Sequence, residues 1–192
     1  MRDAVARLLV RLGVSPDAVT ILGTVGVVVG ALTYAATGWM LAATVIVAVS
    51  TACDLLDGTM ARLARRTTTF GAFLDSVLDR VADAAICVAL VYRYVGDGQL
   101  RPAVAAMLAL VTGYLVPYAR ARAEAVGVSG EAGIAPRFVR LKTLGVGGLL
   151  GGVGLPHAME GALWCVVALA TATVLQRIRH VRRQLVPHRA PH

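Results

Sequence analysis

The sequence predicts an all-α integral membrane protein with six transmembrane helices and an N-terminal amphipathic surface helix. Hydrophobic residues make up 57% of the 192 residues, and the mean hydropathy is +0.71, which is too apolar for a solvated globular domain. The apolar residues gather in long segments that carry almost no charge, as in helices that cross a bilayer. Lys and Arg are concentrated between these segments.

The first expected element covers residues 1–14. Arg2, Arg7 and Arg11 recur among apolar residues, a rhythm typical of an amphipathic helix that lies on the membrane surface. No small-residue cleavage site follows a continuous apolar region, so the pattern does not indicate a signal peptide. We expect a juxtamembrane helix here.

Six apolar segments follow, and several are shorter than the roughly 20 residues that a spanning helix needs. We expect the flanking polar turns to extend these helices. Ser15 and Pro16 are typical of an N-cap and of the first helical position. The sequence therefore predicts one six-helix domain over residues 15–186 and a tail over residues 187–192. The segments are 18–38, 40–53, 84–95, 104–118, 144–155 and 162–176.

The positive charges predict the orientation of the spans. All of the 19 Lys and Arg residues except Arg93 and Arg101 lie in segments that a six-helix topology puts on one side. The positive-inside rule makes that side cytoplasmic. We attribute the net charge of +8 to the excess of Lys and Arg on the cytoplasmic side and to attraction to anionic lipids. We therefore expect no nucleic-acid partner. We expect a multi-pass protein of the cell membrane.

Aspartates at membrane depth give the strongest functional signal. Asp54 and Asp57 share one helix face, and Asp75, Asp79 and Asp83 share another. An ionised side chain in the bilayer costs roughly 2.5–3.5 kcal/mol or more, so such a cluster indicates function. Carboxylate oxygens suit Mg²⁺ or Mn²⁺ with room left for substrate phosphates.

These aspartates belong to a longer run with fixed spacing. It reads D-x2-D-G-x2-A-R-x8-G-x3-D-x3-D from Asp54 to Asp79, with eight fixed positions across 26 residues. This run resembles the signature of the CDP-alcohol phosphotransferases. The resemblance implies six transmembrane helices, a site that faces the cytoplasm, and a homodimer.

The resemblance also implies roles for individual residues. Four aspartates would hold two divalent ions, Mg²⁺ or Mn²⁺, and Asp79 would also act as the catalytic base. The metal ligands would be Asp54, Asp57, Asp75 and Asp79, and the CDP-diacylglycerol contacts would be Asp17, Ala18, Val19, Thr20, Gly58, Arg62 and Thr68. The family reaction transfers the phosphatidyl group of a CDP-linked lipid to an alcohol and releases CMP.

The arginines on the expected cytoplasmic side indicate which alcohol accepts the phosphatidyl group. The segments around Arg120, Arg137 and Arg177 resemble the actinobacterial phosphatidylinositol-phosphate synthase branch, whose acceptor is inositol phosphate. These three arginines would hold the acceptor phosphate, with Arg122 and Arg140 as weaker candidates. The chain departs from that branch by Pro117 in place of Ser, by Arg120 in place of Lys and by Pro136 in place of Glu. Glycerol 3-phosphate, the acceptor of phosphatidylglycerophosphate synthases, therefore stays open as an alternative.

A divalent-cation transporter is the alternative from another class, because acidic residues can also line a membrane pathway. The motif carboxylates gather at one membrane face, which favours an enzyme. Asp83 lies outside the signature, and we expect it to position other groups or to face solvent. The glycines at 145, 147, 148, 151, 152 and 154 are interpreted as helix-packing positions.

Overall fold

The computed structural model describes residues 14–63 and 68–186, and for residues 53–63 only the backbone is described. These residues form six helices and no strand, which confirms the predicted all-α class. Residues 1–13 of the expected surface helix and the tail over residues 187–192 lie outside the described residues.

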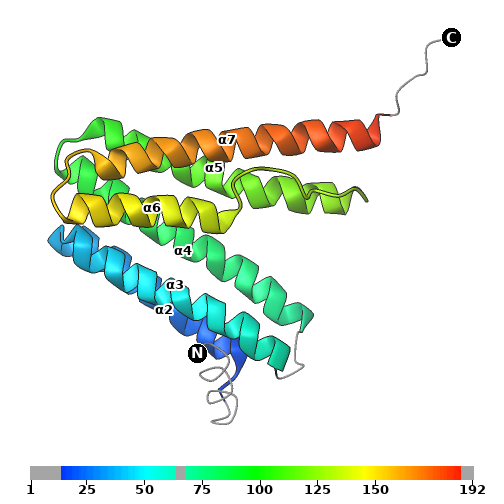
Figure 1. Ribbon diagram of the computed structural model, residues 1–192, viewed down its shortest axis with the longest axis horizontal. Helices are drawn as coiled ribbons and strands as arrows, with labels where there is room; N and C mark the ends of the chain where they lie inside the picture. Colours follow the sequence, from blue (N-terminus) through cyan, green and yellow to red (C-terminus); the bar gives the residue numbers. More distant parts are fainter. Residues whose placement is uncertain (1–13, 64–67, 187–192) are drawn as a thin grey trace.

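The helices form a ring in which each packs against two others (Figure 1). The order of contacts around the ring is α2, α3, α6, α7, α5, α4 and back to α2. The helices converge at one end of the molecule, while the end of α3 and the start of α4 point away from the ends of α5 and α7. Their bounds are α2 Pro16–Thr37, α3 Met40–Leu63, α4 Thr69–Gly96, α5 Leu100–Ala125, α6 Arg137–Gly152 and α7 Ala158–Leu185.

Three of the described helices are long and apolar enough to cross a membrane, namely α2, α5 and α7. Helix α3 contains a shorter apolar stretch, Met40–Ala52, before its polar end. The prediction that all six helices span the bilayer stays a prediction for α3, α4 and α6.

Helix starts follow the capping residues in the sequence. Ser15 accepts a hydrogen bond from the Ala18 N–H at 3.2 Å, and Pro16 occupies the first helical position. Thr68 caps α4 in the same way through the Gly71 N–H at 2.9 Å. Both caps satisfy backbone donors that a helix start leaves without a partner.

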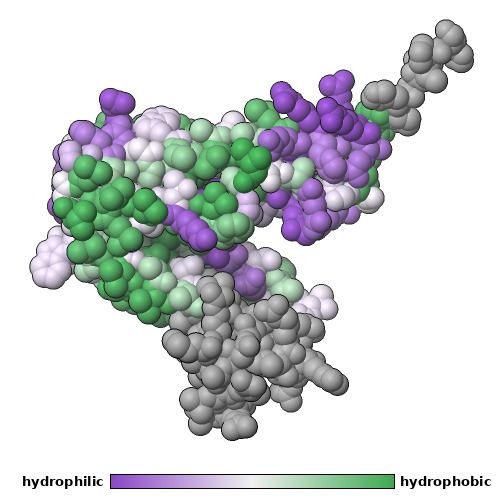
Figure 2. Space-filling model, in the orientation of Figure 1, coloured by the Kyte–Doolittle hydropathy of each residue, from purple (hydrophilic) through white to green (hydrophobic). Residues whose placement is uncertain are grey.

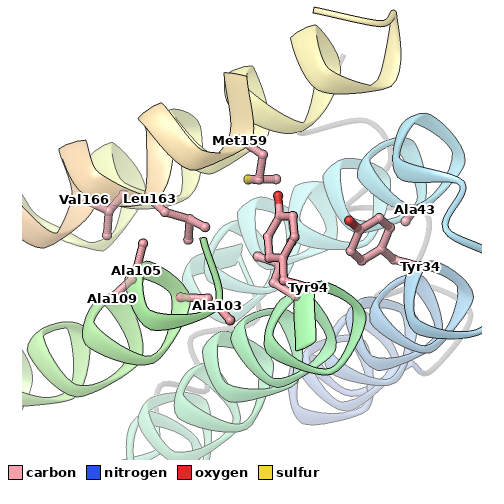
Figure 3. Close-up of a cluster of buried hydrophobic side chains, with 11 residues drawn as sticks. Tyr34, Ala43, Tyr94, Ala103, Ala105, Ala109, Met159, Leu163 and Val166 are labelled. Atoms are coloured by element: carbon pink, nitrogen blue, oxygen red, sulfur yellow. The ribbon is translucent and has the colours of Figure 1, made fainter. Parts of the chain in front are cut away.

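The apolar core lies at the end where the helices converge (Figure 3). Tyr34 and Tyr94 come from the last turns of α2 and α4, and Leu163 comes from the second turn of α7. The first half of α5 contributes alanines, including Ala105 and Ala106, which are fully buried. Small side chains let helices approach closely. The core therefore fixes the bundle at the end away from the aspartate motif.

Gly147, Gly148, Gly151 and Gly152 pack against neighbouring helices, as the sequence predicted, whereas a β-carbon at Gly145 or Gly154 would meet nothing within 4 Å, so the prediction of packing within the bundle is wrong for these two. A β-carbon at Gly147 would lie 2.4 Å from Ala162 Cβ on α7, and one at Gly148 would lie 2.3 Å from Thr44 Oγ1 on α3. Only glycine fits at these distances. The fold therefore holds α6 against both neighbours through positions without side chains.

Candidate functional site

The signature residues lie on two consecutive helices. Asp75 and Asp79 are one turn apart on α4, near its N-terminal end. Asp54 and Asp57 belong to the last turns of α3, together with Gly58, but their side chains lie outside the described residues, as does that of Arg62. The described part of the chain holds no group of three acidic, His or Cys side chains that could bind a metal ion. The four-aspartate metal site stays a prediction.

The start of α2 meets the start of α4, which brings two predicted nucleotide contacts together. A β-carbon at Gly71 would lie 3.0 Å from Thr68 Oγ1 and 3.1 Å from Asp17 Oδ1. A side chain at position 71 would therefore push on both groups, which gives a steric reason for the signature glycine. Val19 and Thr20 lie next to Asp17 in sequence but are buried in the bundle.

An ion-pair cluster surrounds the predicted base. Arg137 Nη1 lies 2.6 Å from Asp79 Oδ1, and Arg137 Nε lies 3.3 Å from Asp83 Oδ1. Arg80 Nη2 lies 3.3 Å from Asp83 Oδ2 and 3.7 Å from Asp79 Oδ2. Arg137 is the first residue of α6, so this cluster joins α6 to α4. Of the three predicted acceptor arginines, Arg137 is therefore the one beside the motif.

Arg120 binds carboxylates on the α5 side of the molecule. Its Nε lies 2.8 Å from Glu124 Oε1, and its Nη2 lies 3.0 Å from Glu131 Oε1. Glu124 is one turn further along α5, and Glu131 belongs to the loop that leads to α6.

Arg177, on α7, binds backbone carbonyls. Its Nε donates to the Ala132 carbonyl at 2.7 Å, and its Nη1 donates to the Val116 carbonyl. Arg120 binds Glu131, and Arg177 binds the carbonyl of the next residue, Ala132, so the two arginines reach the same segment of the loop. The structure therefore groups Arg120 with Arg177 and places both in contacts different from those of Arg137.

Hydrogen bonds join the loop between α5 and α6 to α7 from Ser129 to Ala135. Thr173 accepts from the buried Ala135 N–H at 3.1 Å, and Gln176 accepts from the Ile134 N–H at 3.1 Å. The Gln184 amide exchanges two hydrogen bonds with the Ser129 backbone. Since this loop ends at Arg137, α7 helps to set the position of that side chain.

Sequence reasoning missed two contributors to the site. Arg80 follows Asp79 directly, and its charge between apolar helical turns was a signal that could have marked it. Tyr114 on α5 donates its hydroxyl to the Arg80 carbonyl at 2.8 Å, and no sequence pattern indicates this contact. Arg140, a weaker acceptor candidate, is 5% exposed and donates to the Ala135 carbonyl at 2.9 Å.

An apolar cavity of about 690 Å³ runs between α2, α3, α4 and α6. It reaches Thr51 and Ala52, less than one helical turn before Asp54, and Arg137 and Lys142 line it on the α6 side. Its other lining residues include Tyr34 from the core. The cavity thus connects the motif end of the bundle with its apolar interior.

Hydrophilic residues cover the far ends of α5 and α7, whereas apolar residues cover much of the surface over the other end of the bundle (Figure 2). This distribution separates a polar end, formed by the far ends of α5 and α7, from a mainly apolar body. Such a separation is typical of a bilayer protein whose polar end reaches the aqueous phase.

The sequence and fold match those of known proteins. Residues 13–175 match the family described as CDP-alcohol phosphatidyltransferase. The chain belongs to this family. This result confirms the family predicted from the aspartate run and makes the protein a membrane phosphatidyltransferase rather than a divalent-cation transporter.

Individual relatives of this CDP-alcohol phosphatidyltransferase are named phosphatidylinositol phosphate synthases. A phosphatidylinositol phosphate synthase from Streptomyces avermitilis is 42% identical over 188 residues, which cover 93% of this chain and 77% of the relative. One from Corynebacterium glutamicum is 37% identical over 181 residues, with 92% and 81% covered.

Solved structures share the fold over nearly the whole chain. The Mycobacterium tuberculosis phosphatidylinositol phosphate synthase with CDP-DAG bound superimposes with a TM-score of 0.89 at 32% identity, covering 100% of this chain and 99% of that one. The same enzyme in complex with manganese and citrate gives a TM-score of 0.88 at 34% identity, with 95% and 90% covered.

Proposed function

We propose that the protein transfers the phosphatidyl group of CDP-diacylglycerol to a hydroxyl of inositol phosphate, which yields phosphatidylinositol phosphate and CMP. The observation that carries this proposal is the 2.6 Å contact between Arg137 Nη1 and Asp79 Oδ1. A phosphate bound by Arg137 would bring its alcohol directly beside the carboxylate that takes the proton. The names of the relatives from Streptomyces and Corynebacterium support the same acceptor.

The donor lipid would use the apolar cavity between α2, α3, α4 and α6. Its volume of about 690 Å³ and its apolar lining suit an acyl chain. The CDP part would lie at the motif end, where Thr68 and Asp17 meet beside Gly71. The relative that binds CDP-DAG supports this assignment. The proposed donor contacts are Asp17, Ala18, Val19, Thr20, Gly58, Arg62 and Thr68.

Divalent ions fit the donor set of the motif. Asp75 and Asp79 present carboxylates from one face of α4, and hard oxygen donors are the ligands that Mg²⁺ and Mn²⁺ prefer. We propose that Asp54 and Asp57 complete a site for two ions, and the manganese complex of a relative supports divalent metal use. When bound, such ions would neutralise charge on the pyrophosphate and on the departing CMP.

Arg120 and Arg177 would join Arg137 around the acceptor phosphate. The partners of Arg120 are exposed carboxylates, and exposed ion pairs contribute only about 0–1 kcal/mol, so a dianionic phosphate can replace them. Arg177 donates to the carbonyl groups of Ala132 and Val116, which are neutral acceptors and do not compensate its charge. Arg140 is buried on a backbone carbonyl, and we assign it to structure rather than to the acceptor.

The remaining assignments follow from charge distribution and family resemblance. The six-helix domain over residues 15–186 would be multi-pass in the cell membrane, with the polar ends of α5 and α7 in the cytoplasm. A homodimer is expected from the family, and light scattering of the detergent-solubilised protein measures it.

An acceptor panel tests the function. Purified protein with CDP-diacylglycerol and Mg²⁺ is given inositol phosphate, inositol, glycerol 3-phosphate or serine in turn, and CMP release is measured. Fast release with inositol phosphate alone supports the proposal. Preference for glycerol 3-phosphate would refute the acceptor but keep the reaction class. The Asp79→Asn variant is the negative control.

A further inference from the structure

Asp83 is the carboxylate of α4 that the signature does not include. It nevertheless forms ion pairs with two arginines, Arg80 and Arg137. Its Oδ1 lies 3.3 Å from Arg137 Nε, and its Oδ2 lies 3.3 Å from Arg80 Nη2. Since Asp83 is one turn beyond Asp79, both carboxylates face the same side of α4. Asp83 therefore lies between two arginines that also approach Asp79.

The contacts of Arg137 fix its guanidinium in two directions. Its Nε edge faces Asp83, and its Nη1 faces Asp79. A planar guanidinium held at two separate donors has a defined plane, whereas one contact would leave it free to rotate. Long cationic side chains lose considerable rotamer freedom when ordered, so such a second contact matters for binding a ligand.

The cluster is shielded from solvent. The side chains of Arg137 and Asp83 are 21% and 18% exposed. At the C-terminal end of α4, by contrast, the side chains of the pair Arg93 and Asp97 are each 37% exposed. Ion pairs that are partly withdrawn from water are screened less, and losing one partner leaves the other charge without compensation. Asp83 is therefore placed to influence Arg137 strongly.

Residues from three helices surround Asp83. A small cavity of about 30 Å³ is lined by Asp83, Arg137, Arg140 and Tyr114. The Tyr114 hydroxyl binds the Arg80 carbonyl in the same helical turn of α4. Helices α4, α5 and α6 thus meet around this carboxylate.

We propose that Asp83 is a positioning residue for the acceptor: it binds the Nε edge of Arg137 and thereby presents the remaining donors of that arginine beside Asp79. This inference rests on the proposed function, in which Arg137 receives the acceptor phosphate. Asp83 itself touches neither substrate. Because Asp83 lies outside the signature run, we assign it a role different from that of the metal-binding aspartates.

The test compares Asp83→Ala with the control Asp97→Ala, which removes the ion pair to Arg93 at the C-cap of α4. Removing a charge-assisted contact to Arg137 should raise the acceptor KM roughly tenfold or more, while the KM for CDP-diacylglycerol changes little. Asp83→Glu should recover part of the affinity because it restores the charge. Asp97→Ala should leave both KM values near those of the native enzyme.

A double-mutant cycle shows whether Asp83 acts through Arg137. In the Arg137→Ala background, Asp83→Ala should raise the acceptor KM by less than about twofold, since coupled residues give non-additive effects. Where turnover is too low, calorimetric binding of inositol phosphate supplies the same cycle. An equal factor in both backgrounds, or an effect confined to kcat, would overturn the inference.

The double-mutant cycle can fail independently of the proposed function. The acceptor panel on native protein comes first, and the cycle then uses the phosphorylated acceptor that the enzyme prefers. If Asp83→Ala does not fold, as judged by thermal unfolding, Asp83→Asn replaces it, because Asn keeps the shape and removes the charge. A preference for glycerol 3-phosphate together with a coupled cycle would refute the acceptor and support the role of Asp83.

Discussion

Replacing Thr173 with Val tests whether α7 holds the loop that leads to Arg137. Thr173 is 1% exposed, and its Oγ1 accepts from the Ala135 N–H at 3.1 Å while it donates to the Leu169 carbonyl at 2.8 Å. Val keeps the shape of Thr and removes the hydroxyl. Because Ala135 is fully buried, its N–H would lose its partner without access to bulk water.

The complete burial of Ala135 sets the expected loss of stability. A buried donor left without a partner costs about 1–3 kcal/mol. For a protein of this length, each kcal/mol lowers Tm by roughly 2–4 °C, so Tm should fall by about 2–12 °C. Arg137 follows two residues after Ala135, so a looser loop should also raise the acceptor KM.

Thermal unfolding in detergent and steady-state CMP release measure both effects. Thr112→Val on α5 is the matched control, because the Thr112 hydroxyl donates within its own helix, to the Leu108 carbonyl at 2.7 Å. We expect the control to change Tm and acceptor KM little. Equal losses in Thr173→Val and Thr112→Val would refute the role of this hydrogen bond in holding the loop.

Three further predictions address the motif, the packing and the orientation. Asp75→Asn should abolish CMP release, as should EDTA on the native protein, because a metal ligand is lost; full activity in either case would contradict the metal site. Gly148→Ala should destabilise the protein by about 1–3 kcal/mol in thermal unfolding, because its methyl group would lie 2.3 Å from Thr44 Oγ1; an unchanged Tm would contradict this packing. In a cysteine-free background, Arg183→Cys should be labelled from the cytoplasm and Gln99→Cys from outside, and the reverse pattern would contradict the topology.

Local features of the fold could be predicted because their causes are local. Apolar segments indicated where helices lie, and Ser15 with Pro16 indicated where α2 begins. The motif aspartates were expected on helical extensions beyond the apolar stretches, and α3 and α4 do continue through residues 54–63 and 69–83. Whether α4 and α6 cross the bilayer does not follow from their apolar character, because the first half of α4 carries several charges and α6 has only 16 residues.

Contacts within the site could be predicted only in part. The spacing of Asp75, Asp79 and Asp83 fixes their shared face, because a helix determines it. The pairing of Asp79 with Arg137 joins residues 58 positions apart and depends on how α6 packs against its neighbours. The positive-inside bias explains why Arg120 and Arg177 are basic, but it contains no information on which carboxylate or carbonyl each one binds.

The distribution of small and charged residues explains why the site lies where it does. At one end, the alanines of α5 and the core around Leu163 let the helices pack closely. At the other end, ionised groups on α4 and α6 require partners or water, and the ion pair between Arg137 and Asp83 joins these helices. A bundle closed at one end and joined by ion pairs at the other leaves room for a lipid between them, and the cavity that reaches from Tyr34 to Arg137 occupies this position. Changes in the core should therefore lower stability first, whereas changes in the ion-pair cluster should alter substrate affinity before they alter the fold.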